Sequence, residues 1–182
     1  SNLTEENREA LTALVIYFGT DKFELLVGDI TQLTAKQIKT RNLLRAKVRL
    51  RNRVDIQKHY IYSVALQLFG SSSTSNAIGE LKEFLDSNKG GSGFSFADLM
   101  ADRAGTRLAM LATDSQESAM RVLNHLADVS DEAMLLPELV GLPEGISQEN
   151  FEKHYRDIDS LVYTAMLQNI DERLREIPVY QN

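Results

Sequence analysis

Helix-start signals recur along this 182-residue chain and restrict its fold more than any other pattern in it. The clearest is Ser95-Phe96-Ala97-Asp98, a capping box in which the Ser95 hydroxyl accepts from the backbone three residues on and the Asp98 carboxylate reaches back. Apolar residues at helical spacing accompany these signals. The resulting predicted helices cover 4–18, 35–46, 56–69, 76–87, 95–112, 114–127, 147–155 and 161–176.

Alternating strand and helix units are absent from the pattern, so the sequence predicts an all-α fold. We expect a single domain over 1–182, built as a bundle of six to eight helices with the 95–112 helix at its centre and packed on 56–69. The residues predicted to be buried between these two helices are Val64, Leu68, Phe96, Leu99, Met100, Leu108 and Leu111.

The connections are predicted from their Gly, Pro and Ser content and from local charge patterns. A Gly-rich turn is expected over 88–94, and an irregular connection over 129–146. The short apolar segment 23–30 favours a helix. Over 45–53 basic residues alternate with smaller ones at a period of two, which favours an extended segment.

Composition excludes several classes of protein. The chain has no Cys, which rules out disulfides and thiolate metal sites, and no apolar run approaches the ~20 residues of a membrane span. Residues 1–60 hold 11 Lys or Arg against 7 Asp or Glu, a balance of +4, whereas residues 61–182 hold 9 against 19, a balance of −10. An acidic body of this kind argues against specific nucleic-acid binding.

The basic segment 36–53 carries eight Lys or Arg residues, with no acid between Asp29 and Asp55. One interpretation is a contact with an anionic surface or an acidic protein partner. The other is internal, because the acidic remainder of the chain needs counter-charges. The residues that would bind an anionic partner are Arg45, Lys47, Arg49, Arg51 and Arg53. If these residues form ion pairs with the protein's own acids, the internal interpretation is the correct one.

His59 and Ser63 lie four residues apart on one predicted helix, and Asp98 and Asp102 lie four apart on another. Asp98 has a local role in the capping box, but Asp102 does not. Asp102 sits among small residues that allow close helix packing, where an unpaired acid is costly. We therefore predict a contact between Asp102 and His59, serving either as a polar contact that holds the fold or as a catalytic group.

Other site motifs are missing. The three histidines, His59, His125 and His154, have no paired metal-ligand spacing, and neither a Walker A sequence nor a dinucleotide-binding glycine pattern occurs. We expect no cofactor and no metal site.

Two stretches, Lys58-His59-Tyr60-Ile61-Tyr62-Ser63 and Ser92–Gly105, together resemble uncharacterised bacterial envelope proteins, including YfiM-like lipoproteins. Those proteins pair a Lys-His-aromatic/small-Ser segment with an Asp-Leu-Ala-x-Asp/Asn-x-x-Gly helix, and the similarity covers about 50 of the 182 residues. The resemblance implies a helical, envelope-associated protein and one constellation formed by His59, Ser63, Asp98, Asp102 and Gly105. It leaves the activity open.

The leading expectation is a non-enzymatic envelope protein with a structural or interaction role, periplasmic or membrane-anchored rather than cytoplasmic. The start Ser1-Asn2-Leu3 is typical of an end left by a protease. The sequence therefore leaves open that a natural signal peptide or lipid-anchoring segment precedes Ser1. The alternative is a hydrolase or lyase that uses His59 with Asp98 or Asp102, with or without a divalent metal. A third hypothesis is a cytosolic regulator that binds a partner helix.

Overall fold

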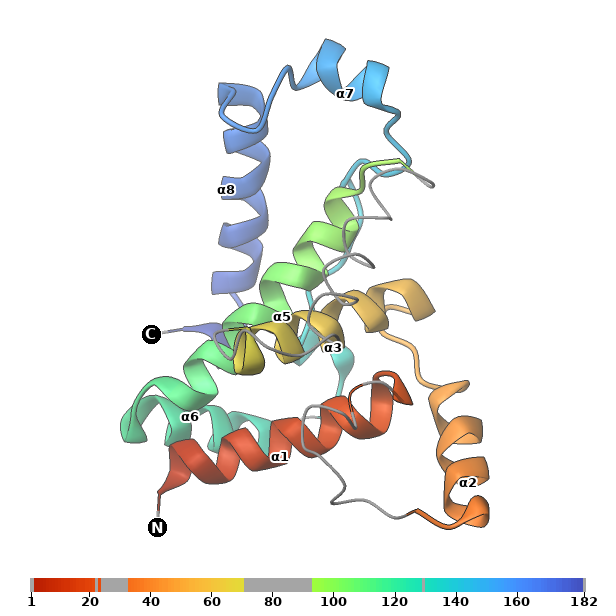
Figure 1. The fold of residues 1–182 in the computed structure, drawn as a ribbon. Helices are drawn as coiled ribbons and strands as arrows, with labels where there is room; N and C mark the ends of the chain where they lie inside the picture. Colours follow the sequence, from red (N-terminus) through yellow and green to blue (C-terminus); the bar gives the residue numbers. More distant parts are fainter. Residues whose placement is uncertain (1, 22, 24–32, 71–92, 129, 182) are drawn as a thin grey trace.

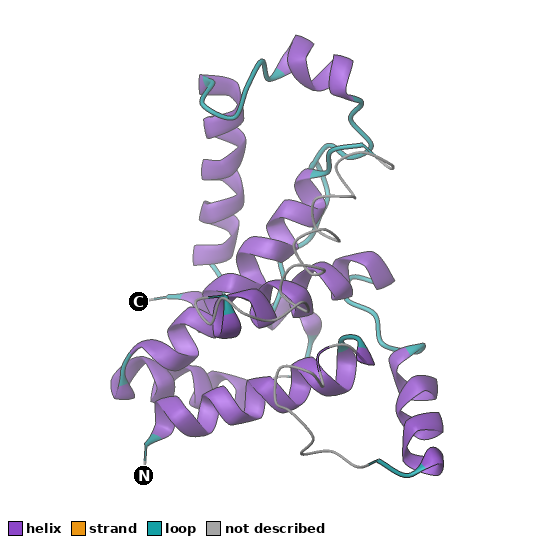
Figure 2. Ribbon diagram, in the orientation of Figure 1, coloured by secondary structure: helices purple, strands orange, loops and turns teal. Residues whose placement is uncertain are grey.

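The computed structural model of the chain describes residues 2–21, 23, 33–70, 93–128 and 130–181 (Figure 1). Within these residues the protein is all-α, as predicted, and Figure 2 shows helices joined by loops. The α-helices are α1 (Leu3–Phe18), α2 (Ala35–Arg45), α3 (Val54–Phe69), α5 (Phe96–Asp114), α6 (Gln116–Ala127), α7 (Gln148–His154) and α8 (Leu161–Arg175). Two short 3-10 helices, η2 (Glu132–Met134) and η3 (Pro178–Tyr180), accompany them.

Side-chain caps begin most of these helices where the sequence predicts them. In each case a hydroxyl accepts from a backbone N–H three residues on, and the capping residues are Thr34, Ser95, Ser115, Ser147 and Ser160. α1 begins one residue before the predicted range 4–18, and its N-cap residue, Asn2, makes no side-chain cap hydrogen bond.

α5 is the central helix and packs along α3, as expected. Gly105 is the point of closest approach: a Cβ there would overlap the backbone carbonyl oxygen of Tyr60 and lie 3.3 Å from the Cβ of Ser63. The two helices therefore meet backbone to backbone. Six of the seven residues predicted for this core are buried, and Leu99 is only partly buried.

α1, α6 and η3 close the rest of the core around α5. The Asn7 amide of α1 donates to the carbonyl oxygens of Ala112 and Ala119, at 3.1 and 3.0 Å, and so ties α1 to the ends of α5 and α6. On another side, the Tyr60 hydroxyl donates to that of Tyr180 at 2.8 Å, and Tyr180 donates to the carbonyl oxygen of Leu135 at 2.6 Å. These bonds satisfy polar groups that burial would otherwise penalise.

The remaining helices lie at the periphery. In Figure 1, α7 and α8 rise on one side of the body and α2 lies on the other, where it contacts α1. An aromatic cluster holds α7 and α8 to the start of α5, with ring centroids 4.9–6.1 Å apart; its members are Phe94, Phe96, Phe151, Tyr155 and Tyr163.

The extended segment predicted over 45–53 is wrong. α2 continues to Arg45, and the chain then makes a tight turn in which Leu50 and Arg53 exchange two backbone hydrogen bonds of 3.0 Å. Arg51 and Asn52 at its centre have φ angles of 53° and 58°, in the left-handed region. The alternation of charges therefore reflects arginines that lie within and beside a turn.

In the connection predicted over 129–146, η2 is the only regular element among the described residues. The helices predicted over 23–30 and 76–87 and most of the Gly-rich turn over 88–94 lie outside the described residues. Of that turn, Gly93 has a φ of 83°, and Phe94 pairs with Ile146 through two backbone hydrogen bonds of 2.8 and 3.0 Å. None of the described helices combines the length and apolar character needed to cross a membrane.

Candidate functional site

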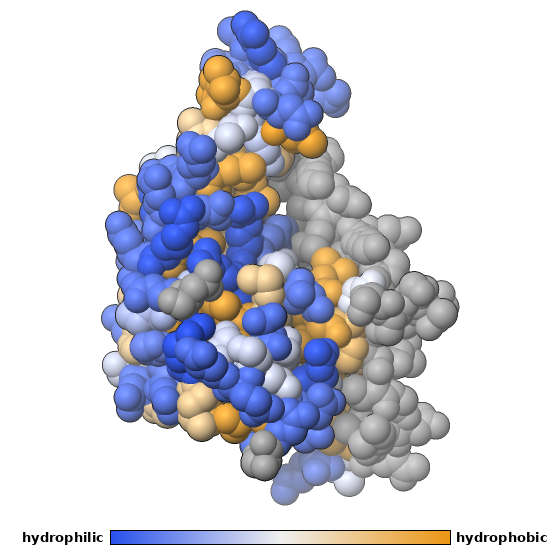
Figure 3. Space-filling model, turned by 90° about the vertical axis from the view of Figure 1, so that its left-hand side faces the viewer, coloured by the Kyte–Doolittle hydropathy of each residue, from blue (hydrophilic) through white to orange (hydrophobic). Residues whose placement is uncertain are grey.

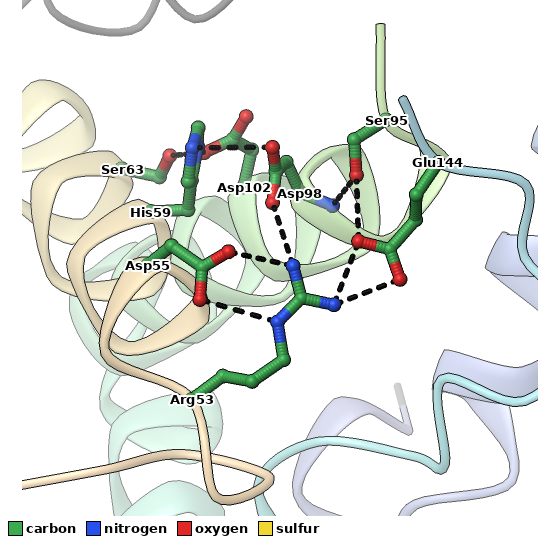
Figure 4. Close-up of polar contacts among 8 residues, drawn as sticks. All are labelled: Arg53, Asp55, His59, Ser63, Ser95, Asp98, Asp102 and Glu144. Carbon is green, nitrogen blue, oxygen red and sulfur yellow. Dashed lines mark hydrogen bonds and ion pairs between the residues drawn. The ribbon is translucent and has the colours of Figure 1, made fainter. Parts of the chain in front are cut away.

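The predicted contact between Asp102 and His59 is confirmed. His59 comes from α3 and Asp102 from α5, and the Nδ1 atom of the imidazole lies 3.0 Å from Oδ1 of the carboxylate (Figure 4). His59 is only 2% exposed, whereas the Asp102 side chain is 27% exposed. The pair therefore has its imidazole in the core and its carboxylate at the edge of the interface.

Asp98 lies one turn earlier on α5 and faces the other nitrogen of the same ring. Its Oδ2 is 3.5 Å from Nε2 of His59, and its side chain is 16% exposed. The backbone N–H of Asp98 donates to Ser95, as the predicted capping box requires. The second half of that box was wrong, because the Asp98 carboxylate turns toward His59 and does not reach back to the Ser95 backbone.

Ser63 completes what we call the His59 cluster, namely His59, Ser63, Asp98 and Asp102. The buried Ser63 hydroxyl donates to Oδ1 of Asp102 at 2.9 Å. A hydroxyl that gives its proton to a carboxylate is not aligned as a nucleophile for the imidazole. Gly105 lies beside the cluster and lets α5 approach α3, so the structure brings together all five residues that the resemblance grouped.

Two opposing influences set the protonation of His59. Burial is the largest and lowers its pKa, but the hydrogen bond with Asp102 and the charges of Asp102, Asp98 and Asp55 together outweigh it, so the pKa lies above its ordinary value of 6.5. For Asp98 burial acts in the opposite direction and raises the pKa; the charge of Asp55 adds to the increase, whereas the charges of His59 and Arg53 oppose it. The cluster thus favours an imidazolium held between two carboxyl groups.

Arg53, just before α3, extends the cluster to a distant loop. Its guanidinium binds Asp55 through bonds of 3.1 and 2.6 Å and Glu144 at 2.7 Å, and lies 3.9 Å from Oδ1 of Asp98 (Figure 4). The hydrogen bond to Arg53 lowers the pKa of Asp55 despite its partial burial. Sequence reasoning missed Glu144, because nothing local marks a residue 91 positions away as the partner of Arg53.

Three of the five residues predicted to bind an anionic partner face the protein's own acids instead. Arg45 binds Asp21, Arg51 binds Glu138 at 2.6 Å, and Arg53 binds the two acids described above. Arg49 donates to the backbone carbonyl oxygens of Ala46 and Val48, at 2.8 and 2.9 Å. The five residues therefore do not form one free basic face, and for the arginines of the turn the internal interpretation holds.

Access to the His59 cluster is limited to its edge. Asp102 lines a groove between α5 and α8, but His59 is not among the residues that line it. Within the described part of the chain, no group of three or more histidine or carboxylate side chains is placed to hold a metal ion. Both ring nitrogens of His59 face carboxylates of α5, so the cluster joins α3 to α5.

No family model, curated protein or solved structure matches this chain. The resemblance to YfiM-like envelope proteins therefore stays a prediction.

Proposed function

We propose that this chain is a non-enzymatic, envelope-associated helical protein that contacts an anionic lipid surface through α2. The His59 cluster holds α3 on α5, and the body so formed carries α2 at its periphery. The single observation that supports the contact is the outward face of α2, where two exposed lysines share one side of the helix with an exposed leucine.

Lys36, Lys39 and Leu43 lie at positions i, i+3 and i+7 of α2 and so share one face. Both lysines are exposed, and Leu43 is 57% exposed. Among the described residues neither lysine has an ion pair or hydrogen bond. Lysines that share a helix face with an exposed apolar side chain are a feature of helices that lie on anionic membranes.

The contrast between lysine and arginine in segment 36–53 favours a lipid surface over an acidic protein. Arg41 and Arg45 of α2 both bind Asp21, and these bonds turn the opposite face of the helix toward the body. Guanidinium groups suit such fixed carboxylate geometry, whereas lysine ammonium groups act as point charges. Point charges suit a diffuse, mobile anionic surface.

Vesicle sedimentation tests the proposal. The intact chain is expected to bind vesicles that contain phosphatidylglycerol, to ignore pure phosphatidylcholine, and to bind less as salt rises. Because each lysine near such a surface contributes about 1 kcal/mol, the K36Q/K39Q double variant should bind about 30-fold more weakly. L43S should weaken binding further.

The matched control is K58Q/K153Q, which removes two exposed lysines from α3 and α7. It should bind like the wild type. Equal losses in both double variants would reduce the effect to net charge, and no binding to either vesicle would contradict a lipid contact and leave an acidic protein as the partner class.

A hydrolase or lyase is the second candidate, and one observation favours it. Oδ1 of Asp98 is buried and has no hydrogen-bond partner within the described residues, and the raised pKa of this acid is a trait of catalytic carboxyls. The test is whether the protein turns over chromogenic ester or phosphoester substrates. Turnover that is abolished in H59Q but intact in K58Q would establish an enzymatic function over the lipid contact.

A further inference from the structure

A groove of about 420 Å³ runs between α5 and α8. Four residues of α5 at helical spacing form one wall, namely Arg103, Thr106, Arg107 and Met110, and Leu174 and Arg175 of α8 lie opposite. The volume is that of a site for a small organic molecule. Figure 3, which views the molecule from the α8 side, shows a mostly hydrophilic face on which hydrophobic side chains form small separate groups.

The negative charges in this groove are already compensated. Asp171 forms a two-pronged ion pair with Arg103, with bonds of 2.8 and 2.7 Å. Asp102, the other acid in the lining, accepts from Ser63 and is paired with His59. Neither carboxylate is left to neutralise a further cation.

Two arginines in the groove lack such a partner. The Nε atom of Arg107 is buried and has no hydrogen-bond partner within the described residues, and Arg175 on the facing helix is exposed and has no ion pair there. A buried donor without an acceptor costs free energy, and a bound anion would supply the acceptor.

We propose that the groove binds a small phosphate monoester, with Arg107 and Arg175 on the phosphate group. Two uncompensated positive charges match the double negative charge of a phosphate monoester better than the single charge of a carboxylate. Guanidinium groups bind phosphate oxygens through two parallel hydrogen bonds. Met110 and Leu174 offer apolar contact to the organic part of the ligand.

This site goes beyond the proposed lipid contact and is independent of it. The groove uses residues of α5 and α8, whereas the lipid contact uses the outward face of α2. Failure of one proposal therefore leaves the other standing, and the variants K36Q/K39Q and R175Q separate them.

Calorimetric titration of the intact chain with phenyl phosphate tests the site. We expect saturable binding that is at least about tenfold weaker in R175Q and in R107Q, because each substitution removes one charged hydrogen-bond donor. Benzoate and inorganic phosphate should both bind more weakly than phenyl phosphate. A short-chain phosphatidic acid, titrated separately, shows whether a soluble ester or a lipid headgroup is the better source of the phosphate.

The control is R121Q on α6, which removes an arginine outside the groove and should leave the affinity unchanged. Because Arg175 is exposed, R175Q keeps the test valid even where R107Q disturbs folding. Absence of saturable binding by the wild type, or equal weakening by R175Q and R121Q, would overturn the proposal.

Discussion

The two sides of α5 carry like-charged pairs at the same spacing, but the two pairs differ in how fully their charges are compensated. Toward α3, the acids Asp98 and Asp102 lie four residues apart and enclose His59. Toward α8, the bases Arg103 and Arg107 also lie four apart, but only Arg103 has a carboxylate partner within the described residues. Like charges at this spacing repel each other on any helix, so each pair needs counter-charges from a neighbouring element.

The difference follows from how closely each neighbour approaches. Gly105 allows the α3 backbone to reach α5, so that partners from α3 meet both acids within hydrogen-bond or ion-pair distance. On the α8 side larger side chains separate the helices and leave a groove. Close packing thus produces a closed, compensated polar cluster, and looser packing leaves charge for a ligand.

The largest expected effect comes from a side chain that blocks the close backbone contact between α3 and α5. Gly105→Ala places a Cβ against the Tyr60 carbonyl oxygen, and neither backbone can yield without moving a helix. We expect a loss of about 3 kcal/mol in the free energy of unfolding, measured by urea denaturation. Thr106→Ala, at an exposed position one residue on, should cost no more than about 0.5 kcal/mol. Equal stability of both variants would refute the close contact.

Removal of Asp102 should have the next largest effect. Asp102→Ala leaves the buried His59 ring without its nearest acceptor and should cost about 2 kcal/mol near neutral pH. His125→Ala, which changes a histidine outside the cluster, is the comparison in the same denaturation assay. A cost for D102A within experimental error of that control would show that the contact contributes nothing to the fold.

The same variant should alter how stability depends on pH. Because folding raises the pKa of His59, its contribution is fully present below pH 6.5 and is lost as the pH rises through the folded-state pKa. Folding lowers the pKa of Asp55 from its ordinary value of 3.8, so Asp55 stabilises the fold above pH 3.8. This stabilisation is lost only in acid, as the pH falls through the folded-state pKa of Asp55. Between about pH 6 and 9 the wild type should therefore lose stability more steeply than D102A.

Ser63→Ala should cost less, about 1 kcal/mol, because it removes one hydrogen bond and leaves the His59–Asp102 pair in place. The same denaturation assay measures it. A cost above that of D102A would show that the hydroxyl, and not the imidazole, is the principal partner of the carboxylate.

The smallest effect is expected on the open side. Arg103→Gln breaks the ion pair with Asp171. Because the side chains of Arg103 and Asp171 are 38% and 26% exposed, respectively, the loss of stability should be about 0.5 kcal/mol. The substitution also frees the Asp171 carboxylate, which should weaken phenyl phosphate binding in the groove. Unchanged binding would show that Asp171 lies too far from the phosphate group to repel it.

Much of the fold could be predicted from local chemistry. Hydroxyl caps such as Ser95 and Ser160 act within three residues of themselves, so the sequence alone shows where α5 and α8 begin. The contact between His59 and Asp102 could also be inferred, because neither residue had a local role and small residues around Asp102 indicated close packing.

The rest depends on contacts between distant segments. Arg51 and Arg53 look like a strand because only their alternation is visible, whereas the left-handed turn at Arg51 and Asn52 depends on acids from the 132–144 connection. The groove likewise depends on α8 standing beside α5. No periodicity within one helix shows which charges a second helix will leave uncompensated.

The most direct test of the closed side of α5 is an NMR titration of the His59 imidazole in the intact chain, with H59Q used to assign its signal. Because the ring lies between Asp98 and Asp102, its pKa in the wild type should be above the ordinary value of 6.5. In D102A the pKa of the ring should be lower than in the wild type. A ring that loses its proton at or below pH 6.5, with no change in D102A, would contradict the account.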